Sequence, residues 1–446
     1  MSMRTQRPAS PQPQAGASSS DIARTLFDVI GHVLGRPPAF GIAAWDGSRV
    51  GPKDAKTTVH INSPVALRRL LWRPNELGMA RAYIAGDLDV QGDLIGALEQ
   101  TFSSAAPPDQ SRDAGLRERL DLVKAAARLG AIGPPPKPPS GEVKLRGRLH
   151  SRGRDAAAVA HHYDVGNDFY RLLLDETMTY SCAYWTSDPS PTFTLADAQR
   201  AKYELICRKL GLRRGMRLLD VGCGWGGMVM HAAQNFGVNA LGITLSREQE
   251  SLARQRIQQA GLNDQIEIRY CDYRELRDEH FDAISSIGMA EHVGAVAFGE
   301  YAGTLHRLLT PTGRLLNHQI SMPDGASRAK GGPTFISRYI FPDGELQPVG
   351  NVVNALERAG FEVRDVESLR ENYHLTLLAW LENLRRNRDE AKKLVGEERV
   401  RTWELYIAAS AAAFNTGHVG IHQTLAIKPD NGRSGLPRIR TQWLCD

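Results

Sequence analysis

The residues best suited to chemistry in this chain begin with the turn "DVGCGWG", in which Asp220 precedes Gly222 and Gly224. Glycine has no side chain, so the backbone here can approach a bound molecule closely, and the helix expected next offers unpaired N–H groups. The apolar run "MRLLDVG" leads into the turn and is typical of a buried parallel strand. Strand, turn and helix together predict a ligand site of the nucleotide-binding kind. A tight strand–helix turn without a ligand is the alternative.

The spacing of these glycines separates two classes of cofactor. A dinucleotide site needs the longer Gly-x-Gly-x-x-Gly and often an acid about 20 residues later, at the ribose. This chain has Gly-x-Gly-x-Gly, and the strand expected after it, "LGITLS", contains no acid. The turn therefore resembles the S-adenosylmethionine site of class I methyltransferases, and S-adenosylmethionine is the expected cofactor.

A polar and aromatic segment, residues 161–185, precedes the turn and contains Cys182 in "MTYSCAYW". The chain has 5 cysteines, and their spacing matches no zinc motif, so no metal site is expected. The N-terminus lacks the apolar core of a secretory signal, and no apolar run is long enough to span a membrane. These features predict reduced thiols and a cytoplasmic protein.

Strand-like and helix-like segments alternate from about residue 156 to 428. The expected strands are "MRLLDVG", "NALGITLS", "QIEIRYCDY", "FDAISSIGM" and "GRLLNHQIS", followed by "EVRDVESL" and "HQTLAI". A helix is expected at "SREQESLARQRIQQAGL", with Ser246 and Gln249 in capping-box spacing and Gly261 at its end. The alternation predicts an α/β fold: a doubly wound, Rossmann-like methyltransferase sheet of parallel strands with helices on both faces. A helical insertion is expected at about residues 330–415.

A smaller α+β domain is expected at residues 21–105, after a start (residues 1–20) whose composition predicts disorder. Its strands are "FGIAAWDGSRVG" and "TTVHI", and "SPVALRRLLW" begins a run of short helices with Ser63 as N-cap. Residues 106–154 predict a basic, proline-rich linker, because "GPPPKPPSGEV" prevents a continuous helix. The methyltransferase domain follows at residues 155–428, and a polar tail at 429–446.

Positive charge is concentrated in residues 112–154. Eleven Lys and Arg stand there against four Asp and Glu, a net of +7, whereas the whole chain carries +5. Such a local excess suits an anionic surface, for which phospholipid headgroups and nucleic acid phosphates are both candidates on charge alone. A solvated linker is the alternative.

Several further motifs occur in one order besides the glycine-rich turn: "MTYSCAYW", "SREQ", "CDYREL", "GMAEHVG", "RYIFPDGEL" and "YHLTLLAW". Together they resemble the cyclopropane-fatty-acyl-phospholipid synthase family over residues 155–428. The N-terminal region resembles the extra domain of its phospholipid-acting members. The resemblance implies methyl transfer from S-adenosylmethionine to the cis double bond of an unsaturated phospholipid acyl chain. It also implies a bound bicarbonate as the general base that takes a proton from the added methyl group, so that a cyclopropane ring closes. Methyl transfer to the double bond creates a carbocation on the acyl chain. The pocket should therefore be dry, because water would trap this cation.

The same resemblance assigns roles to individual residues. The catalytic candidates beside the bicarbonate are Cys182, Glu291, His318, Ile320 and Tyr373. Of these, Glu291, His318 and Tyr373 would hold the anion by hydrogen bonds. The candidates for binding S-adenosylmethionine are Tyr180, Ser181, Asp220, Gly222, Gly224, Thr244, Gln249, Asp272 and Tyr273. Tyr180 and Ser181 would thus touch the cofactor while Cys182 faces the reacting carbon.

Each candidate also has a simpler interpretation. Gln249 can serve only in a capping box, His318 as a hydrogen-bonded core histidine, and Tyr180 as a core aromatic. Two departures from the family pattern matter. Ala290 stands where the family has phenylalanine, which would widen the pocket or shift the acyl register. Ser410 stands where a cysteine is frequent, which excludes a mechanism that needs that thiol as nucleophile.

The expected partners are unsaturated phospholipid acyl chains at an anionic membrane surface, with no nucleic acid, and a homodimer is compatible with this interpretation. The protein is expected to be peripheral on the inner face of the membrane, with the insertion covering an acyl tunnel. The strand "RLLNHQIS" also resembles relatives that make a 10-methylene acyl chain, the precursor of a methyl branch. The sequence also leaves open a catalytically inactive lipid-binding protein and a small-molecule methyltransferase.

Overall fold

The computed structural model describes residues 21–34, 37–104, 124, 127, 129–143, 153–154, 165–277, 279–325 and 333–440. It divides into two compact units, Met1–Ala97 with Ser104–Lys137 and Leu98–Ser103 with Pro138–Asp446. The N-terminal segment 1–20 and most of the basic residues of 112–154 lie outside the described residues, so the predictions made for them stay predictions. Among the described helices, none is long and apolar enough to cross a membrane.

The first unit contains a four-stranded sheet of order β2-β1-β3-β4. The strands are β1 (Gly41–Ala44), β2 (Arg49–Val50), β3 (Thr57–Ile61) and β4 (Leu88–Gly92). The helices are α1 (Asp21–Leu34), α2 (Pro64–Trp72), α3 (Glu76–Ile84) and α4 (Leu94–Ser104), of which the part Leu98–Ser103 of α4 belongs to the second unit. A small apolar core forms around Leu26, Ile42 and Ile61.

Two details of this unit test the sequence predictions. Ser63 is the N-cap of α2, because its side chain accepts a hydrogen bond from the backbone N–H of Val65. Strand β4 was not predicted, since its residues fell within the run of short helices. It pairs antiparallel with β3, with Val90 opposite Val59.

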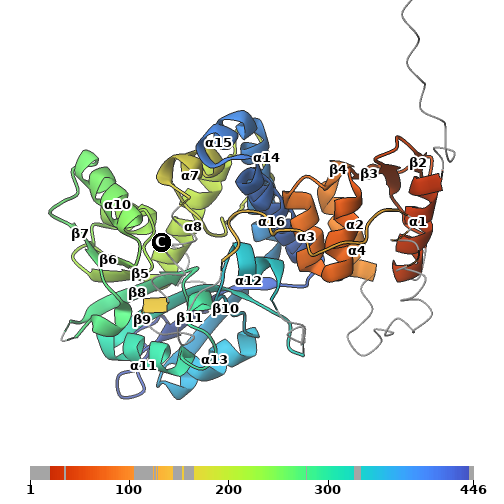
Figure 1. The fold of residues 1–446 in the computed structure, drawn as a ribbon. Helices are drawn as coiled ribbons and strands as arrows, with labels where there is room; N and C mark the ends of the chain where they lie inside the picture. Colours follow the sequence, from red (N-terminus) through yellow and green to blue (C-terminus); the bar gives the residue numbers. More distant parts are fainter. Residues whose placement is uncertain are drawn as a thin grey trace, which may run out of the picture. The chain divides into compact units, whose positions relative to one another are not determined.

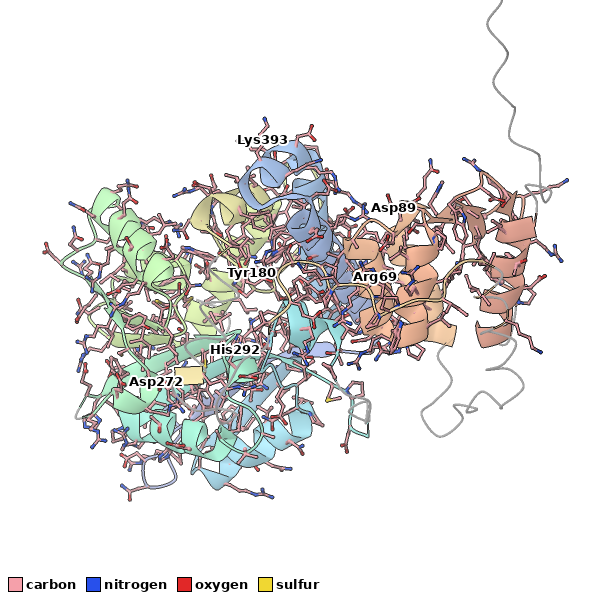
Figure 2. All side chains as sticks on the ribbon, in the orientation of Figure 1. Arg69, Asp89, Tyr180, Asp272, His292 and Lys393 are labelled. Atoms are coloured by element: carbon pink, nitrogen blue, oxygen red, sulfur yellow. The ribbon has the colours of Figure 1, made fainter. Side chains whose placement is uncertain are left out.

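In Figure 2, Arg69 and Asp89 mark this unit; the Arg69 side chain donates to Asp87 at 2.8 Å.

The second unit is built on a seven-stranded sheet of order β10-β11-β9-β8-β5-β6-β7. Its strands are β5 (Arg217–Val221), β6 (Asn239–Thr244), β7 (Ile266–Tyr270), β8 (Phe281–Ile287), β9 (Leu309–Ser321), β10 (Glu362–Ser368) and β11 (Gly420–Ile427). Five neighbouring strands of this sheet, in the order β9-β8-β5-β6-β7, run parallel to one another. The predicted doubly wound, Rossmann-like fold is confirmed.

Helices cover both faces of this sheet (Figure 1). One apolar core joins the sheet to α8 (Leu195–Leu210), α9 (Gly227–Phe236) and α10 (Arg247–Gln259), through residues such as Ile206 and Val229. The other joins it to α11 (Phe298–Leu308) and α13 (Val349–Arg358), through Leu305 and Leu356. The remaining helices are α7 (Asn167–Leu173), α12 (Phe335–Tyr339), α14 (Arg370–Arg386), α15 (Arg388–Val395) and α16 (Glu397–Asn415), with the short turns η2 (Tyr273–Glu275) and η3 (Ala290–His292).

Strand β11 departs from the expected parallel arrangement, because it runs antiparallel to both β9 and β10. Helices α14 to α16 separate β10 from β11 in the chain. They begin where β10 ends and lead back to the same edge, so β11 starts opposite the end of β9, with Gly420 paired to Ser321. The stretch 330–415, expected to be a helical insertion, thus also supplies a sheet strand, and its helical part is chiefly α14–α16.

Candidate active site

A strip of chain, residues 179–185, lies between α8 and α14. From α8, the Gln199 side chain donates to the Ser181 carbonyl at 2.9 Å. From α14, Thr376 Oγ1 accepts from the backbone N–H of Ala183 at 3.1 Å, and Asn372 accepts from that of Trp185 at 2.6 Å. The strip has little regular structure of its own, so these two helices fix its position.

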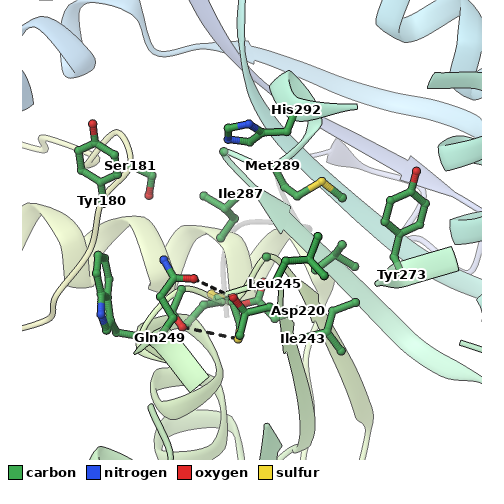
Figure 3. A pocket seen from close by; sticks show the side chains of 18 of the residues that line it. Tyr180, Ser181, Asp220, Ile243, Leu245, Gln249, Tyr273, Ile287, Met289 and His292 are labelled. Carbon is green, nitrogen blue, oxygen red and sulfur yellow. Dashed lines mark hydrogen bonds between the residues drawn. The ribbon is translucent and has the colours of Figure 1, made fainter. Parts of the chain in front are cut away.

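Next to this strip, a cavity opens at the carboxyl edge of the sheet, where loops after parallel strands usually bind ligands. Its lining includes every predicted cofactor residue: Tyr180, Ser181, Asp220, Gly222, Gly224, Thr244, Gln249, Asp272 and Tyr273. Figure 3 shows Tyr180 and Ser181 on one side of the cavity and Tyr273 on the other, with Asp220 and Gln249 between them. Figure 2 locates Tyr180, Asp272 and His292 in the whole unit. The structure therefore brings all nine candidates to one place.

The Gln249 side chain shows why the simpler interpretation of this residue is wrong. Ser246 caps α10 by accepting from the Gln249 backbone N–H at 3.2 Å. The Gln249 side chain does not return to the Ser246 backbone, as a capping box requires. Its Oε1 instead accepts from Thr244 Oγ1 at 2.7 Å inside the cavity. The Gln249 amide group therefore lies in the cavity rather than at the helix end.

Two carboxylates of the cavity differ in their surroundings. Asp220 is buried and accepts from Ser285 Oγ at 2.6 Å; burial raises its pKa to about 6. Asp272 forms an ion pair with Arg274 at 2.6 Å. The positive φ of Gly222 (78°) and of Gly224 (54°) bends the backbone between these acids, which a residue with a side chain would do only under strain.

The catalytic candidates do not line the cavity themselves; Cys182, Glu291, His318 and Tyr373 are buried, and Ile320 is half-buried. Glu291 Oε1 accepts from the backbone N–H of Ile320 at 2.7 Å. His318 precedes Ile320 by two residues on β9, and its carbonyl accepts from Gly288, which lines the cavity, at 2.8 Å. Glu291 Oε2 and His318 Nε2 are both buried and have no partner within the described residues. Unpaired buried polar atoms are costly, so these two atoms need a partner, which a bound ligand or an ordered water would supply.

The protonation states of these two groups follow from their burial. Burial raises the pKa of Glu291 to about 7, although the Ile320 N–H opposes the shift. Burial, reinforced by the charges of Lys202 and Lys209, lowers the pKa of His318 well below its usual range. A neutral Glu291 can donate a hydrogen bond from Oε2, and a neutral histidine donates from one nitrogen. The pair can therefore hold an anion without bringing a charge of its own.

Cys182 and Tyr373 are linked to Ile320 through the backbone of Leu369 and Ile421. The Cys182 thiol is fully buried and donates to the Leu369 carbonyl at 3.8 Å, and the same carbonyl accepts from the backbone N–H of Tyr373 at 3.0 Å. Leu369 in turn donates to Ile421, which is paired with Ile320 across β11 and β9. Burial raises the pKa of the Cys182 thiol, so it stays protonated and is no nucleophile.

Aromatic rings surround Tyr180 on the side of α14 and α16. Its ring stacks on Trp380 with centroids 5.0 Å apart, and its hydroxyl donates to that of Tyr406 at 3.2 Å. Ser410, at the position of the frequent cysteine, bonds to Tyr406. Ala290, by contrast, is packed in the core shared with α11 and α13 and does not line the cavity. Ala290 therefore does not widen the cofactor cavity, and its predicted effect on the acyl pocket stays a prediction.

Lys202 was not among the residues predicted from the sequence, although it lines the cavity and is fully buried. Its Nζ donates to Ser181 Oγ at 2.8 Å and lies 4.7 Å from the centre of the Tyr203 ring. Burial lowers its pKa to about 7, opposed by the carboxylates of Asp175 and Asp220. The sequence did contain a signal that these lysines are buried. Lys202 and Lys209 both fall on the apolar face of α8, together with Ile206.

The buried Lys202 should make stability depend on pH. An unfolded lysine keeps its proton up to about pH 10.4, whereas the folded one loses it near 7, so stability should rise with pH between these values, by up to about 1.4 kcal/mol per pH unit. Lys202→Met lacks this dependence. The stability advantage of Lys202→Met over the wild type should therefore be largest near pH 7 and shrink by about 2–3 kcal/mol toward pH 9 in urea unfolding. Lys393→Met, on the exposed α15 surface, should show no such trend. Parallel curves for wild type and Lys202→Met would contradict a shifted Lys202.

The sheet order, the glycine turn after β5 and the cavity at the carboxyl edge define a class, the Rossmann-like S-adenosylmethionine-dependent methyltransferases. The family model for mycolic acid cyclopropane synthetase matches residues 150–424. The chain therefore belongs to the mycolic acid cyclopropane synthetase family, which confirms the resemblance seen in the sequence.

Individual relatives agree with this assignment. A probable fatty acid methyltransferase of Mycobacterium tuberculosis is 39% identical over 416 residues, 90% of this chain and 93% of that protein. The cyclopropane-fatty-acyl-phospholipid synthase of Escherichia coli is 37% identical over 277 residues, 62% of this chain and 69% of that protein. The crystal structure of the mycolic acid cyclopropane synthase CmaA1 with SAH and CTAB is 36% identical, with a TM-score of 0.57 over 61% of this chain and 98% of that one.

Proposed function

We propose that the protein transfers the methyl group of S-adenosylmethionine to the cis double bond of an unsaturated phospholipid acyl chain, forming a cyclopropane ring. The observation that carries the proposal is the link between two sites. Gly288 lines the cofactor cavity, and its backbone N–H donates to the His318 carbonyl at 2.8 Å. Glu291 Oε2 and His318 Nε2 are two buried polar atoms with no partner in the described structure. The names of the relatives support a lipid acyl substrate.

The hydrogen-bond donors of the second site, formed by Glu291 and His318, suit a bicarbonate ion. Neutral Glu291 and neutral His318 offer hydrogen bonds to its oxygens, and a second carboxylate charge beside it would be repulsive. When bound, S-adenosylmethionine supplies an electrophilic methyl group, and the bicarbonate supplies a base for the proton that leaves it. The residues of this chain keep the two groups in fixed positions, because Ser181 on the cofactor side and Cys182 on the anion side are consecutive in one strip.

The same residues suit a cationic intermediate on the acyl chain. The protonated Cys182 thiol offers no nucleophile that would trap it. The rings of Tyr180, Trp380 and Tyr373 lie together, with Tyr373 and Trp380 centroids 6.0 Å apart. Aromatic faces attract cations by up to about 2 kcal/mol when water is excluded. These rings therefore support a dry wall for the reacting carbons.

The experiment that tests the proposal combines the purified chain, S-adenosylmethionine and vesicles of unsaturated phospholipid, with and without bicarbonate. The acyl chains should gain one CH2 group, at a rate that rises with bicarbonate, and NMR should show a cyclopropane ring. An exocyclic methylene would support the 10-methylene alternative instead. Vesicle binding without consumption of the cofactor would support an inactive lipid-binding protein.

We propose that the basic segment, residues 112–154, attaches the protein to anionic membranes. Arg154 is excluded from this role, because it forms an ion pair with Asp343 at 2.7 Å. Each basic residue near a membrane surface contributes about 1 kcal/mol, so reversing Arg146, Arg148 and Arg152 to glutamate should weaken binding to anionic vesicles by up to about 10²-fold. Sedimentation at rising salt should show the same loss for the wild type, since salt screens exposed charges.

The matched control reverses three exposed arginines outside the segment, Arg213, Arg214 and Arg433. That variant should bind like the wild type, and both variants should keep their affinity for S-adenosylmethionine. Equal binding of the wild type to neutral and anionic vesicles would contradict electrostatic attachment.

A further inference from the structure

Three buried polar side chains form a continuous path from α8 to the anion cluster. Lys209 on α8 is 2% exposed, and its Nζ donates to Gln423 Oε1 at 2.9 Å. The amide nitrogen of Gln423, on β11, lies 3.3 Å from His318 Nδ1 on β9. Gln423 and His318 stand opposite each other in the antiparallel register of these strands. Both are fully buried, so water does not compete for their hydrogen bonds.

The chemistry of each group fixes the direction of every bond in this path. An ammonium only donates, so the amide atom that faces Lys209 must be the oxygen. The amide nitrogen, which also only donates, then faces the histidine. Nδ1 of His318 must therefore accept, and the proton of the neutral ring must lie on Nε2. Lys209 is itself held in place by the carboxylates of Glu367 and Asp365.

We propose that Gln423, oriented by Lys209, is a positioning residue that selects the Nε2–H tautomer of His318 and so makes this nitrogen a hydrogen-bond donor toward the bound anion. Nε2 is the His318 atom without a partner among the described residues. Burial keeps the ring neutral, so the tautomer alone decides whether the ring offers a proton or a lone pair there. A lone pair would repel the anion. The identity of the anion rests on the proposed function, whereas the tautomer does not.

Two substitutions at Gln423 separate tautomer selection from packing. Gln423→Glu keeps the shape, but its carboxylate accepts from Lys209 and also from His318, so the proton should move to Nδ1. Gln423→Met keeps the length and favours neither tautomer. We expect kcat to fall by about 10- to 100-fold in Gln423→Glu, as is typical for residues that orient a ligand, and by less in Gln423→Met. Affinity for S-adenosylmethionine should stay unchanged in both.

The direct readout is ¹⁵N NMR of histidine-labelled protein without substrate. The chain has 13 histidines, so the His318 signals are assigned by their loss in His318→Asn. The wild type should show an unprotonated Nδ1 and a protonated Nε2, Gln423→Glu the reverse, and Gln423→Met a mixture. Lys209→Met should also give a mixture, because the amide can then rotate.

Two results would overturn the proposal: a wild type with the proton on Nδ1, or a larger loss of kcat in Gln423→Met than in Gln423→Glu, which is the order that packing predicts. If the wild type does not methylate unsaturated phospholipid, the proposed function fails, but the NMR result still decides the tautomer.

Discussion

Replacement of Glu291 by leucine is expected to lower kcat by about 10²–10³-fold, the usual effect of removing one preorganised electrostatic group, while S-adenosylmethionine binds as before. Glu291 accepts from the Ile320 backbone through Oε1, and its Oε2 has no partner among the described residues, so it is free for the proposed anion. Leucine has a similar size but no hydrogen-bond donor, so the proposed anion loses one of its hydrogen bonds. Calorimetry for the cofactor and turnover with unsaturated vesicles measure the two effects separately.

The pH profile tests the protonation state that this role requires. Glu291 has a pKa of about 7, so its neutral, donating form is present below 7 and disappears as the pH rises through that value. Wild-type kcat should therefore decline above about pH 7. In the variant Glu291→Gln, the amide does not titrate and can donate a hydrogen bond at every pH. The amide of Gln423 does not titrate either. The ratio of wild-type to Glu291→Gln activity, in which the supply of bicarbonate cancels, should thus fall with pH.

A matched control is Glu357→Leu, at an exposed position of α13, which should keep full kcat. If Glu291→Leu turned over as fast as the wild type, Glu291 would have no catalytic role, and the two unpaired atoms would need another explanation.

Three of the predicted cofactor residues, Gly222, Gln249 and Asp272, were predictable because each follows a sheet strand in a local motif. Gly222 follows β5, Gln249 follows β6 and Asp272 follows β7 within a few residues. The carboxyl ends of parallel strands meet at one edge, so side chains just beyond them converge whatever their distance in the chain. The parallel direction of β5 to β8 follows from the alternation of strands and helices, whereas their order in the sheet comes from the structure alone.

The polar path to His318 could not be predicted in this way. Lys209 and Gln423 are separated by 214 residues, and they meet only because β11 inserts between β9 and β10. The strand "HQTLAI" was predicted, but nothing local in it encodes an antiparallel direction, which comes from the three helices before it. A single histidine or glutamine in a strand therefore carries no information on its partner.

Strand β4 was missed for a different reason. Its five residues, Leu88–Gly92, alternate over too short a length to outweigh the helical segments on both sides. Its pairing with β3 supplies the stability that its own sequence lacks. The turn at Gly86, with φ of 77°, was the signal that the helix had ended.

Substitution of Gly222 by valine is expected to weaken S-adenosylmethionine binding by about 10²–10³-fold, roughly 3–4 kcal/mol. A β carbon at this position would lie 3.0 Å from Met289 Cγ, another residue of the cavity lining, so the side chain would take up space meant for the cofactor. The φ of 78° adds strain, since a β-branched residue rarely adopts it. Titration calorimetry with S-adenosylmethionine measures the loss.

The effect of backbone strain must be separated from the effect of a side chain that fills the cavity. A substitution at Gly215 provides this control. It has a similar φ of 85°, but a β carbon there meets no atom within 4 Å, and it lies in the turn before β5, away from the cavity lining. Gly215→Val should therefore lower thermal stability through backbone strain alone and yet bind the cofactor like the wild type. If both variants lost cofactor affinity equally, the effect would come from the strained sheet edge, and the close approach of Gly222 to the ligand would be wrong.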